Sequence, residues 1–210
     1  MKKLLFTLAI FISFGGYAQE VLLNDYAKNE SGDYDKSNKY KQLHFSTYTK
    51  QNEGKAFEGI LIKEKKGYSS STRPYISIPI EHIAEFQIFL KNGRDKFLKW
   101  ENTRVENNID DMSKTIALFP HKLLVSGDDY GYFSKMSDVK LDFDSSGGTS
   151  KMTLSVYINN GVRSDSMYLY MIDTSEDWKD LALLRFINDL TVEKVQAEID
   201  KINGSGDLFN

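Results

Sequence analysis

Residues 150–172 constrain the fold most, because they predict one specific β-hairpin. Asn160-Gly161 is the preferred pair for a two-residue hairpin turn, since both turn positions need positive φ. A turn there pairs Asn159 with Val162. This register sets apolar residues together on one face, Leu154 with Met167 and Met152 with Leu169. The opposite face carries Tyr157, Ser155, Thr153 and Lys151 against Ser164, Ser166, Tyr168 and Tyr170. Because the turn and the hydrophobic pattern agree, we expect an antiparallel sheet here.

The pattern of alternating residues predicts further strands on both sides of this hairpin. Residues 113–172 are interpreted as a β-meander, with a second turn at residues 144–148 between strands over 139–143 and from Ser150 onward. Earlier strands are expected over 43–48, 57–62 and 75–78.

A long helix is expected after Pro79, whose missing N–H is tolerated in a first helical turn. Apolar residues then recur every three or four positions, at Ile83, Phe86, Leu90, Phe97 and Trp100. Gly93 lies in the same stripe, where it would let the helix approach a sheet or another helix closely. The alternative is that Asn92-Gly93 breaks the helix in two.

A second long helix is expected after a capping box at Asp173 and Glu176. Its apolar positions continue to Ile202, and Gly204-Ser205-Gly206 is expected to end it. The fold class is therefore α+β, with one or more antiparallel β-meander sheets packed against two long helices. The order of strands followed by one helix occurs twice and resembles the Whirly and Pur-type repeat arrangement. That resemblance implies a duplicated sheet-plus-helix unit, with halves at 43–108 and 109–203; a plain α+β domain over 43–203 is the alternative.

The N-terminus predicts export. Lys2 and Lys3 precede an uncharged apolar run from Leu4 to Phe14, and small residues at Gly16 and Ala18 suit signal peptidase. The Ala18-Gln19 junction resembles signal peptides of the Bacteroidota. We therefore interpret residues 1–19 as a signal peptide, 20–42 as a polar N-terminal segment and 204–210 as a C-terminal tail. No transmembrane segment is expected after cleavage, and the expected location is the periplasm or the extracellular space.

Composition narrows the classes of partner. Loss of Lys2 and Lys3 takes Lys and Arg from 27 to 25 against 30 Asp and Glu, a net charge of about −5. An acidic protein lacks the basic surface that nucleic-acid binding requires. The chain has no cysteine, which excludes disulfides, thiol catalysis and a lipid anchor on cysteine. No glycine loop for a phosphate and no other cofactor motif occurs, so no cofactor is expected.

Two sets of residues are candidate binding sites. Tyr157, Tyr168 and Tyr170 share one face of the predicted hairpin, where aromatic rings beside Ser, Thr and Lys can stack on sugars or pack on a partner protein. The alternative is that the first helix covers this face.

Asp142 and Asp144 begin a pattern that copies the first half of an EF-hand loop, but its twelfth position is Thr153, where calcium needs Glu. A weak oxygen-only calcium site is the remaining metal hypothesis.

The histidines show no pattern typical of a metal site. His44, His82 and His121 are widely separated, and we interpret them as ordinary surface or core residues.

The sequence thus predicts an exported, non-enzymatic binding or envelope-associated protein, with a glycan or an envelope protein as partner. The alternative is a secreted hydrolase with an unrecognised carboxylate and histidine site.

Overall fold

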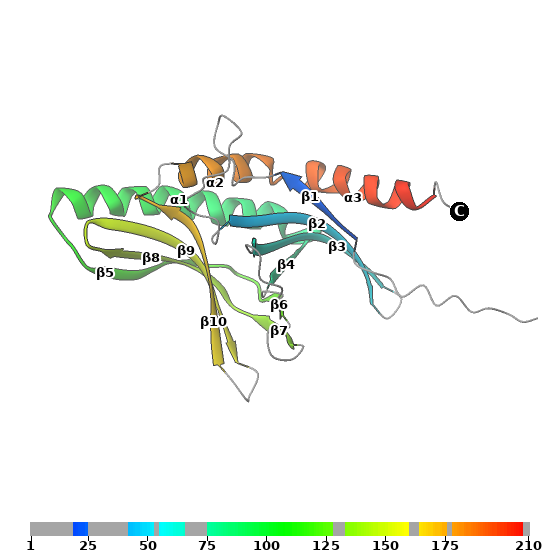
Figure 1. Cartoon of the computed structure of the whole chain (residues 1–210), viewed down its shortest axis with the longest axis horizontal. Helices are drawn as coiled ribbons and strands as arrows, with labels where there is room; N and C mark the ends of the chain where they lie inside the picture. The colour runs from blue at the N-terminus through cyan, green and yellow to red at the C-terminus, as the bar shows by residue number, and fades with distance from the viewer. Residues whose placement is uncertain are drawn as a thin grey trace, which may run out of the picture.

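Two antiparallel sheets and three α-helices make up the part of the chain that the computed structural model describes (Figure 1). It describes residues 19–24, 42–52, 55–65, 75–127, 133–159, 164–175 and 178–207. The first sheet has the order β1-β2-β3-β4-β6-β7 and the second has the order β10-β9-β8-β5. The strands are β1 (Gln19–Asn24), β2 (Gln42–Asn52), β3 (Lys55–Lys65), β4 (Tyr75–Pro79), β5 (Met112–Leu118), β6 (Leu123–Gly127), β7 (Phe133–Ser137), β8 (Val139–Ser146), β9 (Thr149–Asn159) and β10 (Ser164–Asp173). The predicted α+β class is confirmed.

One long helix and two shorter helices pack on these sheets, where the sequence predicted two long helices. The long helix is α1 (Ile83–Glu106), preceded by a short 3-10 turn, η2 (Ile80–His82). The shorter helices are α2 (Trp178–Asp189) and α3 (Val192–Asp207). None of the described helices combines the length and the hydropathy of a membrane-spanning segment.

A break at Leu190-Thr191 explains the division between α2 and α3. The Thr191 hydroxyl accepts a hydrogen bond from the Lys194 N–H at 3.3 Å, as the cap of a new helix does. α3 then runs through Gly204, Ser205 and Gly206 to Asp207, so the predicted stop at these residues is wrong. The predicted cap Asp173 instead accepts hydrogen bonds from the N–H and the hydroxyl of Ser175, and Glu176 lies outside the described residues.

Two consecutive strand pairs join the sheets into one unit. β5 pairs with β8 in the second sheet, and β6 pairs with β7 in the first. Only Asp138 separates β7 from β8, and the Phe119 N–H donates to the Val139 carbonyl at 2.8 Å where the sheets meet. The four residues 119–122 lie opposite only Asp138 and Val139 between the last pair of one sheet and the first pair of the other. These strands are therefore one long hairpin with a bulge between the two sheets.

The long hairpin links the two halves that the sequence suggested, 43–108 and 109–203. Strands β6 and β7 belong to the predicted second half, yet they lie beside β4 in the sheet of the first half. A boundary between residues 108 and 109 thus cuts the first sheet. The first sheet also includes β1, which begins earlier than the expected domain start at residue 43. The apolar run Val21-Leu22-Leu23 is the sequence signal for that strand.

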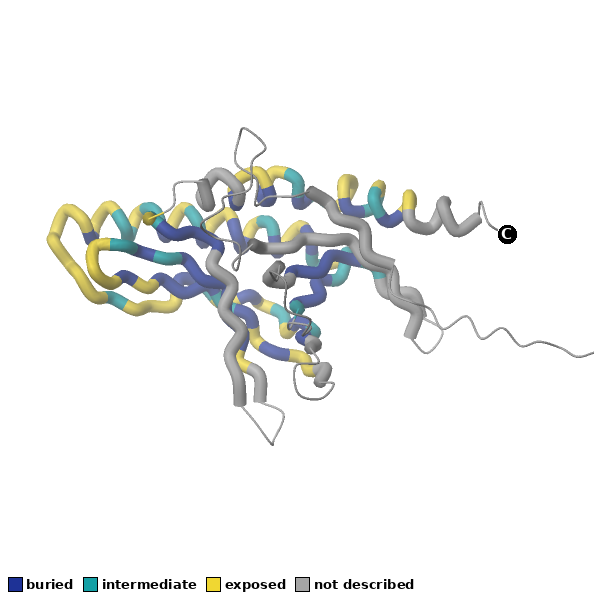
Figure 2. Tube along the Cα trace, viewed as in Figure 1, coloured by how far each residue is buried: buried dark blue, intermediate teal, exposed yellow. Residues whose placement is uncertain are grey.

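α1 continues without a break past Gly93, because the glycine is needed at this position for packing. A Cβ built on Gly93 would lie 2.2 Å from Cδ1 of Leu141 on β8. The helix therefore lies directly on the second sheet, which is one of the two packings that the sequence left open at Gly93. The alternative of a break at Asn92-Gly93 is wrong. Around this contact Phe97 and Trp100 pack on Phe143, and the buried segments face each other between α1 and the sheets (Figure 2).

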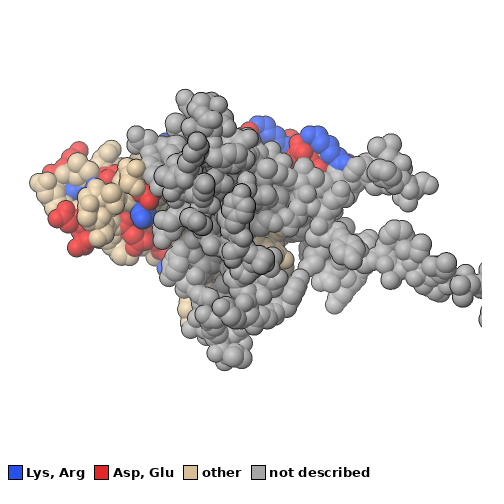
Figure 3. All heavy atoms as spheres, viewed as in Figure 1, with Lys and Arg blue, Asp and Glu red and all other residues tan. Residues whose placement is uncertain are grey.

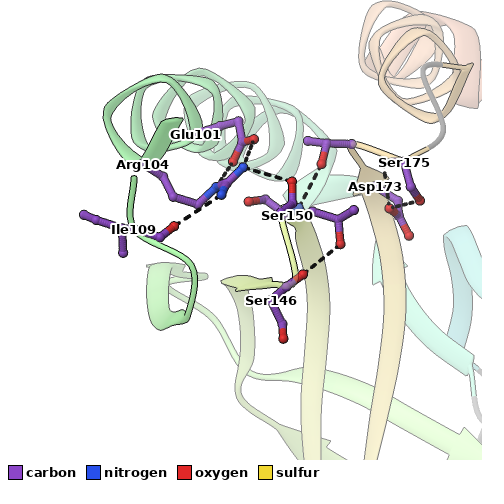
Figure 4. Close-up of polar contacts among 10 residues, drawn as sticks. Glu101, Arg104, Ile109, Ser146, Ser150, Asp173 and Ser175 are labelled. Carbon is purple, nitrogen blue, oxygen red and sulfur yellow. Dashed lines mark hydrogen bonds and ion pairs between the residues drawn. The ribbon is translucent and has the colours of Figure 1, made fainter. Parts of the chain in front are cut away.

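Arg104 ties the C-terminal end of α1 to the turn between β8 and β9. Its guanidinium binds Glu101 through two bonds of 2.9 Å and donates to the carbonyls of Ile109 and Gly148 at 3.2 and 3.1 Å (Figure 4). The hydrogen bond from Arg104 lowers the pKa of Glu101 in spite of its partial burial, which raises it. In the turn that Arg104 binds, Gly147 and Gly148 have φ of 57° and 80°. These two glycines form the predicted second turn.

The predicted hairpin is present, but its register differs by two residues. Leu154 pairs with Leu169 and Val156 with Met167, so the strands are joined by residues 160–163 rather than by a two-residue turn at Asn160-Gly161. A shift of one residue would turn every side chain to the other face, whereas a shift of two leaves the faces unchanged. The predicted faces therefore hold even though the predicted pairs do not. A bulge between Tyr170 and Ile172 shifts the register once more.

Candidate ligand-binding face and histidine cluster

The second sheet has one face against α1 and one face away from it. Leu141, Phe143, Met152 and Leu154 are fully buried on the face that α1 covers. Alternation along the strands places the other set on the opposite face, which we call the outer face. The outer face includes Ser113, Thr115 and Leu118 of β5, Lys140, Asp142 and Asp144 of β8, Lys151, Thr153, Ser155 and Tyr157 of β9, and Ser166, Tyr168, Tyr170 and Asp173 of β10.

The register unites the two candidate sites that the sequence predicted. Tyr168 pairs with Ser155, which pairs with Lys140, and Tyr170 pairs with Thr153, which pairs with Asp142. The tyrosines and the aspartates thus lie on the same face of the same sheet. Sequence alternation predicted each set on its own, but their meeting depends on the pairing of β8 with β9.

Among the described side chains of the outer face, Tyr157 is the exposed aromatic residue. Its side chain is 59% exposed, and its backbone pairs with Ser166. The alternative that α1 covers this face is therefore wrong for Tyr157, because α1 lies on the other side of the sheet. The side chains of Tyr168 and Tyr170 are outside what the structure describes, so only their positions on the face are known.

Asp142 is held by three partners. One carboxylate oxygen accepts a hydrogen bond from the Thr115 hydroxyl at 2.8 Å. The other accepts from the Ser155 hydroxyl at 2.5 Å and lies 3.0 Å from Nζ of Lys140. Burial raises the pKa of Asp142, but the hydrogen bonds from Ser155 and Thr115 and the charge of Lys140 outweigh it and lower the pKa below its usual value.

Asp144 is more exposed and accepts a hydrogen bond from the Ser113 hydroxyl at 2.6 Å. A calcium ion bound by Asp142 and Asp144 would have to share these oxygens with hydroxyl donors and with the Lys140 ammonium. The metal assignment of these two residues stays a prediction. Their observed contacts link β5, β8 and β9, three of the four strands of this sheet.

A group that the sequence did not predict lies where the two sheets meet. The ligating atoms of His82, Glu85 and His121 all lie within 4.8 Å of one another. Nε2 of His121 is 2.7 Å from Oε2 of Glu85, and Nδ1 of His82 is 3.7 Å from the same oxygen. The two imidazole rings are stacked with their centroids 4.2 Å apart.

The sequence carries a signal for one of the two contacts in this group, the proximity of His82 to Glu85, but not for the approach of His121. His82 and Glu85 are three residues apart at the start of a predicted helix, which places them on one face. His121 is 36 residues from Glu85, and only the bulge of the long hairpin brings it to the helix. No spacing rule could predict that contact.

Two described pockets lie elsewhere. A groove of about 270 Å³ separates α1 from α2 and is lined by Gln87, Ile88, Lys91, Arg94, Asp95, Leu184, Ile187 and Asn188. A smaller pocket of about 110 Å³ lies at the far end of α1, near Trp100 and Arg104. Neither pocket brings a histidine together with a carboxylate.

Comparisons of the chain with protein-family models, with curated proteins and with solved structures gave no match.

Proposed function

We propose that the protein is an exported, non-enzymatic binding protein that recognises its ligand through the outer face of the second sheet. The observation that carries this proposal is the 59% exposure of Tyr157 on the sheet face opposite α1. Thr153 and Ser155 on the same face are buried, so the accessible part of this stretch of β9 lies at Tyr157. An aromatic ring held on a rigid strand offers contact area at a small cost in conformational entropy. Tyr168 and Tyr170 occupy the neighbouring strand on the same face.

A glycan is the ligand class that this face suits best. Sugar rings stack on aromatic side chains, and their hydroxyls bond with carboxylates, hydroxyls and ammonium groups of the kind that Asp144, Ser113 and Lys140 supply. Acidic side chains gather at the end of the molecule where α1 ends and β8 turns into β9 (Figure 3). That charge disfavours a nucleic acid or another polyanion as the partner. An envelope protein is the second class of partner.

Export rests on the sequence of the first 19 residues. Cleavage after Ala18 or Gln19 would retain nearly all of β1, whose pairing with β2 starts at Gln19. The predicted signal peptide therefore ends where the first described strand begins, which supports the proposal. A secreted hydrolase is the alternative, and the one observation in its favour is the meeting of His82, Glu85 and His121.

The test uses protein recovered from outside the cytoplasm, with a first residue expected near Gln19 or Glu20 by mass spectrometry. Binding is measured on a glycan array and then by titration with the glycan that binds best. Tyr157→Ala is expected to weaken binding by roughly tenfold, because one aromatic contact contributes about 1 kcal/mol beyond its area. Tyr157→Phe, which keeps the ring, should bind nearly as the parent protein does.

Met136→Ala is the matched control. Met136 lies on β7 of the other sheet with 53% exposure, so its loss removes a comparable exposed side chain away from the outer face. Equal binding by the parent protein and Tyr157→Ala, or an array without any bound glycan, overturns the proposed ligand class. Recovery of the exported protein with residues 1–18 intact overturns the signal peptide.

A further inference from the structure

We propose that His82, Glu85 and His121 form a binding site for a divalent transition-metal ion, with zinc as the expected occupant. The site lies apart from the outer face and is independent of the function proposed there. Two imidazole nitrogens and one carboxylate oxygen are a ligand set that zinc takes in proteins. These three atoms already lie within 4.8 Å of one another.

The two parts of the site come from rigid elements. His82 ends η2 and Glu85 lies in the first turn of α1, so one helical turn sets their separation. His121 lies in the bulge between β5 and β6. Bulges turn side chains out of the regular strand pattern and are frequent beside functional sites. Here the bulge aims His121 at the start of α1.

The ring of Phe119 packs against the rings of both histidines. Its buried ring meets the rings of His82 and His121 edge to face, with centroids 6.3 and 5.7 Å apart. The same ring packs on Phe86 and Phe89 of α1 at 5.4 and 5.3 Å. An aromatic base of this kind limits the positions that the imidazoles can take, which reduces the entropy lost when a metal binds.

The open side of the group admits an ion from solvent. The side chains of His82, Glu85 and His121 are 25%, 53% and 41% exposed. A metal ion would replace the hydrogen bond of 2.7 Å between Nε2 of His121 and Oε2 of Glu85. The imidazole rings are stacked at 17°, so the more exposed His121 ring must rotate to direct its lone pair at the same ion as His82. Three protein ligands leave a fourth tetrahedral position for water.

The opposing explanation is a plain hydrogen bond between a histidine and a carboxylate on the surface. It requires no affinity for metal, so a metal titration separates the two. The experiment uses the full chain, purified without a polyhistidine tag and treated with a chelator. Co²⁺ reports tetrahedral coordination through its visible absorption, and Zn²⁺ is then added to displace it. We expect one equivalent of each ion to bind.

Three variants test the ligands and one serves as the control. His82→Ala, His121→Ala and Glu85→Gln should each weaken zinc binding by roughly 100-fold or more, since loss of even an outer-shell partner costs about 10- to 100-fold. His44→Ala removes the third histidine of the chain, which lies on β2, and should leave the affinity unchanged. Circular dichroism of each variant checks that it is folded.

Two further readouts keep the test decisive if His82→Ala does not fold. Zinc should shift the side-chain NMR signals of His82 and His121 and leave those of His44 in place. Zinc at about 100 times its dissociation constant should raise the melting temperature by roughly 5 to 10 °C. Absence of the Co²⁺ absorption, or zinc binding that survives in Glu85→Gln and His121→Ala, overturns the site.

Discussion

Asp142 shows how one buried carboxylate sets the behaviour of a sheet with pH. Its partners Thr115 and Ser155 come from the two strands that flank β8, so a single side chain fastens three strands. The lowered pKa means that the folded state favours the ionised form more than the unfolded chain does. The resulting stability is complete above the usual value of 3.8 and is lost as the pH falls through the lower folded value.

Asp142→Asn is therefore expected to act mainly at neutral pH. It should lower the free energy of unfolding at pH 7 by about 2 kcal/mol, because hydrogen bonds to a charged group contribute about 1.5 to 3 kcal/mol. As the pH falls from 3.8 toward the lower folded value, the difference from the parent protein should shrink, because the unfolded chain takes up a proton there that the folded carboxylate does not. Urea unfolding at a series of pH values from 7 to 3 measures this.

Asp144→Asn is the control, because it removes the same charge two residues along the same strand. Its carboxylate binds Ser113 on the exposed part of the face and bridges two strands rather than three. A loss of stability in Asp142→Asn that stays constant from pH 7 to pH 3 would contradict the assigned role of the ionised carboxylate.

At the scale of the elements, Gly93 allows α1 to pack closely on β8 of the second sheet. Gly93→Ala favours the helix by about 1 kcal/mol through propensity. The new Cβ would also collide with Leu141, which is fully buried and cannot move into solvent. Overpacking of this kind costs about 1 to 3 kcal/mol, so we expect a net loss of roughly 1 kcal/mol.

Asn92→Ala is the matched control for Gly93→Ala. Asn92 is exposed on the same helix, so the change alters helix propensity alone and should raise stability by up to about 0.5 kcal/mol. Thermal unfolding followed by circular dichroism measures both variants. A Gly93→Ala protein more stable than Asn92→Ala would show that α1 can move away from β8 without cost.

Local patterns predicted the elements better than their partners. Alternation placed the strands and their faces, because the period of two is a local property of each strand. The register of β9 and β10 differs from the prediction by two residues, since a favourable turn pair in the sequence does not by itself fix which strand residues pair. The break at Thr191 escaped too, because the apolar stripe of α2 continues in phase into α3.

Contacts across the long hairpin could not be predicted in the same way. The sequence indicated strands over 113–172 but carried no signal that β6 and β7 leave this meander for the first sheet. The approach of His121 to Glu85 follows from that departure. Non-local partners of this kind depend on tertiary packing, which a single sequence does not display.

The long hairpin predicts cooperative unfolding at the scale of the whole molecule. Neither sheet is complete without strands that continue into the other, so the two sheets should unfold together. Urea unfolding measured by far-ultraviolet circular dichroism and by tryptophan fluorescence should give coincident transitions. Trp100 reports on the second sheet through Phe143, whereas circular dichroism reports on both sheets. Two separate transitions would contradict the coupling and favour independent halves.

The short link at Asp138 also limits how this chain can vary in length. β7 and β8 run in sequence with one residue between them, so their side-chain alternation has a common phase. An inserted or deleted residue at this point would turn one strand over relative to its own sheet and expose its buried face. The turn at Gly147-Gly148 has no such constraint, because it ends both strands at an exposed tip. Homologous chains should therefore agree in length at Asp138.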